Sequence, residues 1–243
     1  MSRKEGGTVN RLIQLLDKNQ SSGEKLMIMR LNQSLIPAPE IESAVQILKE
    51  NGFQAVCLVC DEDMEDCLKS AAEFAAKGMS VILETEFHKV FLYGIPDFAR
   101  QAAASSVFGI RVPNLPFEEQ GQLAVYLLDE EGPFLIREIS ASSGDRIVQN
   151  MKFARGLIWC TNQGNLDFLS GLDGDPYMFY LFAADAAATQ PVIIDFGSTC
   201  RADMESYLEV VSGAVAGSGL AEQMQSCGYS DDVLKSYCGQ FQK

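Results

Sequence analysis

The sequence contains no long apolar run and few basic residues. No stretch approaches the roughly 20 apolar residues of a membrane span, and the first twenty residues lack the continuous apolar segment of a signal peptide. The 19 lysines and arginines stand against 33 acidic residues, which gives a net charge of −14. Because nucleic acids and anionic membranes bind basic faces, neither partner is expected, and we predict a cytoplasmic protein.

Histidine is scarce too, since His88 is the only one. It is interpreted either as a solvated loop residue or as a group that orients substrate or shuttles a proton. The seven cysteines are odd in number and lie mostly in apolar runs, which favours reduced thiols. A zinc site built from Cys57, Cys160 and Cys200 has no support from spacing, so no metal and no other cofactor is predicted.

What the sequence does contain is an alternation of short β-rich runs with longer amphipathic segments. An amphipathic helix is predicted first, over residues 8–20. Nearly continuous apolar strands separated by helices are typical of parallel strands covered on both faces. The predicted strands cover residues 26–31, 55–60, 80–86, 109–114, 133–139, 157–162, 191–197 and 213–219.

Eight such units in 243 residues fit a closed (β/α)₈ TIM barrel better than a doubly wound open sheet, which is the alternative. Barrels of this size form one domain, so we expect residues 1–243 to form a single barrel with an extra N-terminal helix. The glycine-containing stretch 163–175 is interpreted as a candidate lid or as an ordinary long loop. Asp175-Pro176 should begin a helix.

Two glycine–serine turns stand at the ends of the last two predicted strands, at Gly197-Ser198 and Gly217-Ser218. Glycines let backbone N–H groups approach an anion, and seryl hydroxyls add donors. A phosphate site is often built at these two strand ends in (β/α)₈ enzymes. We therefore predict a site for a small phosphorylated ligand, with tight turns that simply need glycine as the alternative. Asp195 would repel such a ligand unless it points away or is protonated.

A set of segments comprises residues 10–16, 89–99, 112–119, 144–147, 195–198 and 215–220. In order and spacing, this set resembles the tryptophan synthase alpha chain family. The resemblance extends over nearly the whole chain and implies a (β/α)₈ barrel that acts in tryptophan biosynthesis. The family is a lyase that cleaves indole-3-glycerol phosphate to indole and glyceraldehyde 3-phosphate, and it passes the indole to a beta subunit that uses pyridoxal phosphate.

The resemblance also suggests site residues. Gly197, Gly217 and Ser218 would hold the phosphate, and Ser198 belongs to the same predicted site. Phe196 would line the indole pocket. The remaining positions of the predicted substrate pocket are Trp159, His88 and Asn114.

The acid–base half of the family's site is not matched. Cys57 stands where the reaction needs a carboxylate, and the loop that carries a second acid is absent, because Cys60 leads directly into residues 61–63 and a helix. Losing a general acid or base typically costs about 10²–10⁴-fold in rate. The sequence therefore predicts a divergent active site.

Glu84 and Glu86 are the candidates to take over proton transfer. They share one strand face, with Glu86 at the rim of the barrel mouth and Glu84 one layer deeper. A buried glutamate has a raised pKa and can act as a general acid or base. The alternative is a polar layer in which these residues pair with Arg30 or Arg111, or with Arg137.

Two other functions stay open. The chain could be a non-catalytic partner or regulator of a pyridoxal-phosphate beta-type subunit, with Lys89, Phe91 and Leu92 as the contact patch. It could also be a barrel repurposed for another phosphorylated metabolite.

Overall fold

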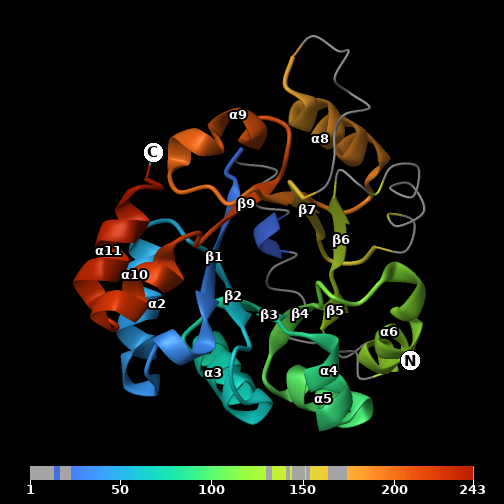
Figure 1. Cartoon of the computed structure of the whole chain (residues 1–243), viewed down its shortest axis with the longest axis vertical. Helices are drawn as coiled ribbons and strands as arrows, with labels where there is room; N and C mark the ends of the chain where they lie inside the picture. The colour runs from blue at the N-terminus through green and yellow to red at the C-terminus, as the bar shows by residue number, and fades with distance from the viewer. Residues whose placement is uncertain are drawn as a thin grey trace.

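The chain folds as an α/β barrel, with strands in the centre and helices around them (Figure 1). The computed structural model describes residues 14–16, 23–129, 133–140, 143, 151, 154–163 and 174–242. Every strand pairing within these residues is parallel. The strands are β1 Leu26–Asn32, β2 Ala55–Val59, β3 Ser80–Glu84, β4 Val107–Arg111, β5 Phe134–Leu135, β6 Arg137–Ser140, β7 Ile158–Thr161, β8 Val192–Asp195 and β9 Gly213–Ala216.

The fifth predicted strand, 133–139, is broken into two pieces. The strand order is β5-β4-β3-β2-β1-β9-β8-β7-β6, so the two edges of the sheet are β5 and β6, which follow each other in the chain. β5 pairs with β4 and β6 pairs with β7, and only Ile136 lies between them. This continuity brings the two edges together and makes the sheet a barrel, which rules out the doubly wound alternative.

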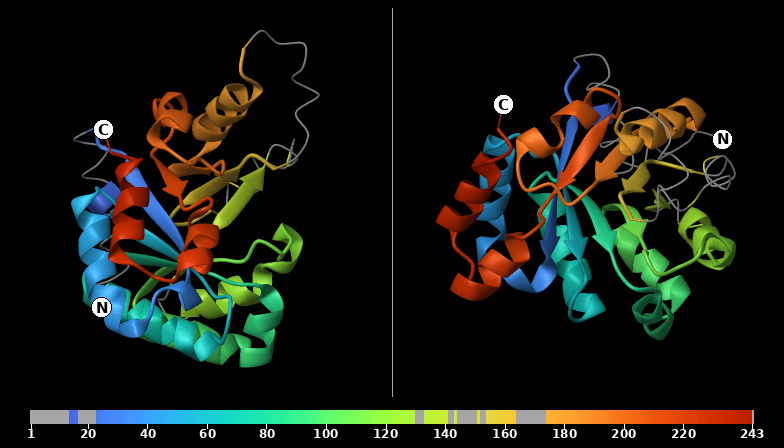
Figure 2. Two further views of the ribbon diagram at one scale, coloured as in Figure 1. Left: turned by 60° about the vertical axis from the view of Figure 1, so that its left-hand side comes forward. Right: turned by 45° about the horizontal axis from the view of Figure 1, so that its top comes forward.

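Helices with one apolar face cover the outside of the strands. In α2, Ile41, Ala44, Val45 and Leu48 recur at helical spacing and are buried. α11 packs against α2, so the end of the chain lies beside its first third (Figures 1 and 2). The helices are α2 Ile41–Glu50, α3 Met64–Ala76, α4 Phe87–Tyr93, α5 Ile95–Ala104, α6 Gly121–Asp129, α8 Pro176–Ala187, α9 Glu205–Leu208, α10 Leu220–Cys227 and α11 Asp231–Gly239.

Two of these helices begin at aspartate caps that the sequence places there. The Asp63 carboxylate accepts from the amides of Glu65 and Asp66 at the start of α3. Asp175 accepts from the amide of Tyr177, and Pro176 occupies the first position of α8, as predicted. Only four residues separate the end of β2 from the start of α3, which leaves no room for a long loop there.

The interior of the barrel and the shell between strands and helices form separate apolar cores. Leu16, from the described part of the predicted N-terminal helix, is buried in the interior core. The rest of that helix lies outside the described residues. The interior core also contains Leu26, Ile28, Ala55, Cys57, Ile82, Phe108, Ile136, Leu157, Trp159, Ile193 and Val215.

Several strands end earlier than predicted. β3 stops at Glu84, which leaves Glu86 outside it, and β4 stops at Arg111. β8 and β9 end before Gly197 and Gly217, whose φ values of 70° and 132° take the chain out of the extended region. Most of the candidate lid, residues 164–173, lies outside the described residues. No helix in the described ranges is long and apolar enough to cross a membrane.

Candidate functional site

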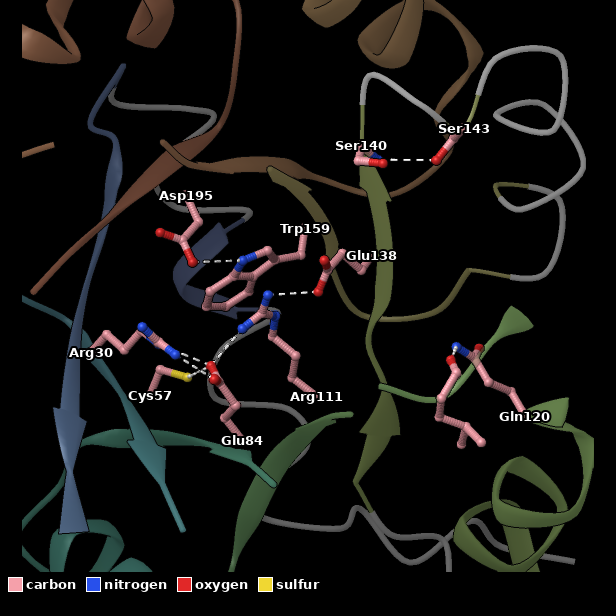
Figure 3. A network of polar contacts seen from close by, with 11 residues as sticks. Arg30, Cys57, Glu84, Arg111, Gln120, Glu138, Ser140, Ser143, Trp159 and Asp195 are labelled. Carbon is pink, nitrogen blue, oxygen red and sulfur yellow. Dashed lines mark hydrogen bonds and ion pairs between the residues drawn. The ribbon is translucent and has the colours of Figure 1, made fainter. Parts of the chain in front are cut away.

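Charged side chains from several strands converge inside the barrel at the carboxyl ends of its strands (Figure 3). They follow the apolar interior residues at a spacing of two, as Arg30 follows Ile28 and Glu84 follows Ile82, so they form the next layer of the same interior face. We call this layer the mouth network. It consists of the charged residues Arg30, Glu84, Arg111, Glu138 and Asp195, together with the indole of Trp159 that donates to Asp195.

Glu84 lies at the centre of the network and is buried. One carboxylate oxygen accepts from Arg30 Nη2 at 2.5 Å, and the other accepts from Arg30 Nε at 3.0 Å and Arg111 Nη1 at 2.5 Å. Burial opposes ionisation, but the hydrogen bonds and charges of the two arginines outweigh it and hold the pKa of Glu84 below its ordinary value. The expected raised pKa is therefore wrong, and Glu84 is an ionised partner of both Arg30 and Arg111.

Arg111 continues the network toward β6 and β7. Its Nη2 donates to Glu138 at 2.6 Å, and its guanidinium carbon lies 4.8 Å from the ring centroid of Trp159. Burial raises the pKa of Glu138, and the charge and hydrogen bond of Arg111 offset this only in part. Arg137, also considered for the network, instead donates to Gln120.

Asp195 is held differently from the other two carboxylates. It is half-buried at the end of β8, and one oxygen accepts from Trp159 Nε1 at 3.2 Å. No arginine or lysine among the described residues forms an ion pair with it. Burial raises the pKa of Asp195, and the charges of Arg111 and Arg30 offset this only in part.

Cys57 lies below Glu84, with its Sγ 3.7 Å from a Glu84 carboxylate oxygen. Burial, followed by the charge of Glu84, raises the pKa of the Cys57 thiol well above its ordinary value, which disfavours a nucleophilic thiolate. Cys160 is buried in the outer core and Cys200 is partly exposed, and all described cysteines are free. The described residues form no group of three or more potential metal ligands.

Glu86 and His88 lie at the edge of the mouth and pair with each other. His88 Nδ1 is 3.0 Å from Glu86 Oε2, and both side chains are exposed, by 59% and 63%. Asn114 Oδ1 accepts from the amide of Phe87 at 2.8 Å, so this side chain holds the start of α4. These residues stand apart from the hydrogen bonds of the mouth network.

The two glycine–serine turns lie beside each other. A Cβ placed on Gly197 would be 3.8 Å from Ser218 Oγ. Gly217 must be glycine, because its φ is 132° and a Cβ there would overlap the carbonyl oxygen of Arg30. Its N–H donates to the Tyr237 hydroxyl at 3.1 Å, and that hydroxyl donates to the Ser218 carbonyl at 2.8 Å. Tyr237 of α11 thus fixes the turn after β9.

The turn after β8 is fixed from both sides. Asp203 accepts from the amides of Thr199 and Cys200, at 2.8 and 3.1 Å, just beyond the buried Ser198. Phe196 packs between Tyr177 and Tyr207, with ring centroids 5.3 and 5.2 Å away. Phe196 therefore belongs to an aromatic group with α8 and α9 beside this turn.

Lys89 connects α4 to the shortened turn after β2. Its Nζ donates to the carbonyls of Cys60 and Glu62, at 2.7 and 3.0 Å. Phe91 and Leu92, on the same helix, are exposed by 67% and 80%. The predicted contact patch is therefore reduced to Phe91 and Leu92, since the Lys89 amine is committed to the turn.

The family model described as tryptophan synthase alpha chain matches residues 54–237. The chain belongs to the tryptophan synthase alpha chain family. The alpha chain of Lachnospira eligens is 28% identical over 164 residues, 67% of this chain and 62% of the relative. That of Clostridium beijerinckii is 28% identical over 191 residues, 78% and 70% of the two chains. The chain thus spans less than two thirds of the Lachnospira alpha chain.

Solved structures confirm the barrel. Tryptophan synthase from Mycobacterium tuberculosis, in an aminoacrylate-bound form, superimposes with a TM-score of 0.80 at 18% identity, over 95% of this chain and 97% of that one. The alpha chain from Legionella pneumophila gives a TM-score of 0.80 at 16% identity, over 95% of each chain. At these identities the likeness bears on the fold alone.

Sequence reasoning missed the roles of three residues in this candidate site. Glu138 lies on the same strand as Arg137 but points inward, because it follows the interior residue Ile136 at a spacing of two. Tyr237 reaches the turn from a helix far away in sequence, which no local pattern reveals. Asp195 was weighed only as an obstacle to phosphate, although alternation with Ile193 places it in the interior.

Proposed function

We propose that this barrel binds a small phosphorylated ligand at the turns after β8 and β9. The observation that supports it best is the proximity of the two glycine–serine turns, with Gly197 next to the hydroxyl of Ser218. Backbone N–H groups and a seryl hydroxyl at adjacent turns are donors suited to phosphate oxygens. The start of α10, capped by Gly219 without a side-chain acceptor, adds positive potential on the same side.

The donors proposed for the phosphate are the amides of Gly197 and Ser198 and the amide and hydroxyl of Ser218. Gly217 has a positioning role in this proposal, because its N–H is bonded to Tyr237. The hydroxyl of Ser218 is exposed at the turn, so it can be removed without opening the core.

The test is calorimetric titration of the purified chain with glycerol 3-phosphate. Ser218→Ala should weaken binding by about tenfold, the effect of one lost hydrogen bond to a charged group. Ser226→Ala is the matched control, because Ser226 is an exposed serine on α10 whose hydroxyl contacts only the helix carbonyl of Gln223. Absence of glycerol 3-phosphate binding to the unmodified chain would overturn the proposal.

The family's carbon–carbon lyase reaction needs a proton-transfer group, and we assign that role to Glu86. Glu84 is held ionised between two arginines, whereas Glu86 is exposed at the end of β3 beside His88. The assay is indole release from indole-3-glycerol phosphate, with and without a beta subunit. Glu86→Gln should abolish any turnover and leave the affinity for glycerol 3-phosphate nearly unchanged; unchanged turnover would remove the assignment. If the unmodified chain releases no indole, the lyase function is excluded and only the proposed binding function remains.

A second candidate function is that of a cytoplasmic partner for a pyridoxal-phosphate beta-type subunit. Two neighbouring large apolar side chains, Phe91 and Leu92, are exposed on α4. The double variant Phe91→Ser and Leu92→Ser should abolish co-elution with a beta-type subunit. Val125→Ser, at another exposed apolar position on α6, is the control. Failure of the unmodified chain to co-elute, or to change the subunit's rate, would exclude this function.

A further inference from the structure

Two cysteines lie together at the turn after β2, on the outer side of the strands. Cys60 directly follows β2, and Cys67 is the fourth residue of α3. Both belong to the outer core, whereas Cys57, three residues before Cys60, belongs to the barrel interior. The neighbouring thiol of Cys60 is therefore Cys67, and the two thiols hydrogen-bond to each other.

The backbone holds these two side chains next to each other at the start of α3. Cys60 Sγ lies 3.9 Å from the carbonyl oxygen of Asp63, and the same oxygen accepts from the amide of Cys67 at 3.1 Å. The sulfur of Cys60 is also 4.0 Å from Met64 Sδ, in the first turn of α3. A bond between the two sulfurs therefore needs only local movement of this turn and leaves the strands in place.

The surroundings of Cys60 favour its thiolate. The hydrogen bond from Cys67 is the largest cause that lowers the pKa of the Cys60 thiol. The charge of Lys89 and a hydrogen bond from Thr85 add to it, and together they outweigh burial and the charge of Asp61. Lys89 is held in place because its amine donates to the Cys60 carbonyl. The buried Thr85 hydroxyl has no other hydrogen-bond partner among the described residues.

Cys67 has the opposite character. Its hydrogen bond to Cys60, together with burial, raises the pKa of its own thiol. The pair thus combines one sulfur that ionises easily with one that stays protonated. A reactive thiolate next to a second, protonated thiol is the arrangement found where one sulfur attacks an oxidant and the other resolves the product.

Burial limits which oxidant can reach the pair. Cys60 is 4% exposed and Cys67 is fully buried, but residues 61–63 of the turn that covers them are exposed. A small neutral oxidant needs only a local opening of this turn, whereas a bulky thiol reagent needs a larger one. Cys227 on α10 is exposed, so it offers a comparison in which accessibility and thiol reactivity are separated.

We propose that Cys60 and Cys67 form a peroxide-reactive thiol pair, with Cys60 as the attacking sulfur and Cys67 as the resolving one. The Cys60 thiolate attacks one oxygen of hydrogen peroxide, the O–O bond breaks, and the departing hydroxide takes a proton to become water. The Cys67 sulfur then attacks the sulfenic acid on Cys60. An S–S bond forms, the S–O bond breaks, and the hydroxyl leaves as water with the thiol proton of Cys67. This inference is independent of the proposed phosphate-binding function.

The test is mass spectrometry of the full, reduced chain after treatment with hydrogen peroxide, with the remaining thiols blocked in denaturant. The thiol count should fall by two from the seven of the reduced chain, and dithiothreitol should restore it. Lys49 and Lys69 bound a tryptic peptide that contains Cys57, Cys60 and Cys67. This peptide should lose two hydrogens and carry the blocking group only on Cys57. A further cut at the acidic residues between Cys60 and Cys67 should leave the two pieces joined.

Single variants separate the two roles. Cys67→Ser should stop the reaction at the sulfenic acid on Cys60, which dimedone traps. Cys60→Ser should leave Cys67 reduced. Cys227→Ser, the matched control at the exposed cysteine, should form the disulfide as the unmodified chain does. Circular dichroism checks that each variant is folded, and the mapping in the unmodified chain decides the matter if one variant is not.

The order in which the thiols react supplies the opposing outcomes. Peroxide should oxidise Cys60 before Cys227, while a bulky maleimide should modify Cys227 first because that thiol is exposed. The proposal is overturned if peroxide oxidises Cys227 first, if Cys60 becomes linked to Cys57, or if Cys60 is oxidised without a link to Cys67. Survival of all seven thiols in peroxide would overturn it as well.

Discussion

The lower and upper layers of the barrel interior hold the same strands together in opposite ways. The lower layer is apolar, with residues such as Ile28, Ile82 and Ile193. Two positions further along each strand, the upper layer carries Arg30, Glu84 and Asp195. Apolar packing tolerates substitutions of similar volume, whereas a buried charge network fails when one partner is removed. The upper layer is therefore the part of this barrel where single changes should have the largest effects.

Removing the centre of the network should have the largest effect on stability. Glu84→Ala leaves Arg111 buried and Arg30 without their shared carboxylate. We expect the free energy of unfolding to fall by about 3–5 kcal/mol, measured by urea denaturation. Glu86→Ala, an exposed glutamate two residues away, should change it by no more than about 0.5 kcal/mol. Equal losses in the two variants would show that the ion pairs add nothing to the upper layer.

The close backbone contact between Arg30 and Gly217, in the turn after β9, should give the next largest effect. Gly217→Ala places a Cβ against the carbonyl of Arg30 at a φ of 132°. We expect a loss of about 1–3 kcal/mol and weaker binding of glycerol 3-phosphate, because β9 and β1 must move apart. Gly121→Ala, at the start of α6 with open space around it, should be neutral or slightly stabilising. A Gly217→Ala chain as stable as its Gly121→Ala counterpart would contradict the close approach.

A smaller effect is expected where α11 fixes the turn. Tyr237→Phe removes the hydroxyl that accepts from Gly217 and donates to Ser218, at a cost of about 1 kcal/mol. Glycerol 3-phosphate affinity should fall as well, because the turn loses its support. Tyr229→Phe removes a hydroxyl that bonds to Asp231, and it should leave that affinity unchanged. An equal change of affinity in both variants would mean that Tyr237 does not position the turn.

The sequence predicts the lower layer more completely than the upper one. Nearly continuous apolar strands separated by amphipathic segments identify the barrel, and the caps at Asp63 and Asp175 identify helix starts. The direction of Arg111 could not be predicted, because a shift in the β3–β4 register at Val81–Ile82 changes which residues of β4 point inward. Pairing partners such as Glu84 and Arg111 are 27 residues apart, beyond the reach of any local pattern.

The smallest expected effect is a dependence of folding stability on pH, and its sign should differ between the carboxylates of the upper layer. The pKa of Asp195 is raised above its ordinary value of 3.8 by burial, with Arg30, Arg111, Glu84 and Glu138 around it. Its favourable contribution to stability is fully present below that value and is lost as the pH rises through the folded-state pKa. Asp195→Asn should therefore be more stable than the unmodified chain at neutral pH, and the difference should shrink on acidification.

The contribution of Glu84 to stability should change with pH in the opposite direction, so one experiment distinguishes the two carboxylates. Its pKa is lowered below 4.5, so its contribution is present above that pH and is lost as the pH falls through the folded-state pKa. Urea denaturation of the unmodified chain, Asp195→Asn and Glu84→Gln between pH 3 and 8 gives both differences, with the range chosen to span roughly the ordinary carboxyl pKa values. A stability difference for Asp195→Asn that stays constant with pH would mean that Asp195 is ionised as easily in the folded barrel as in the unfolded chain. An ionised Asp195 would add a negative charge beside the turn after β8 and would repel a nearby anion.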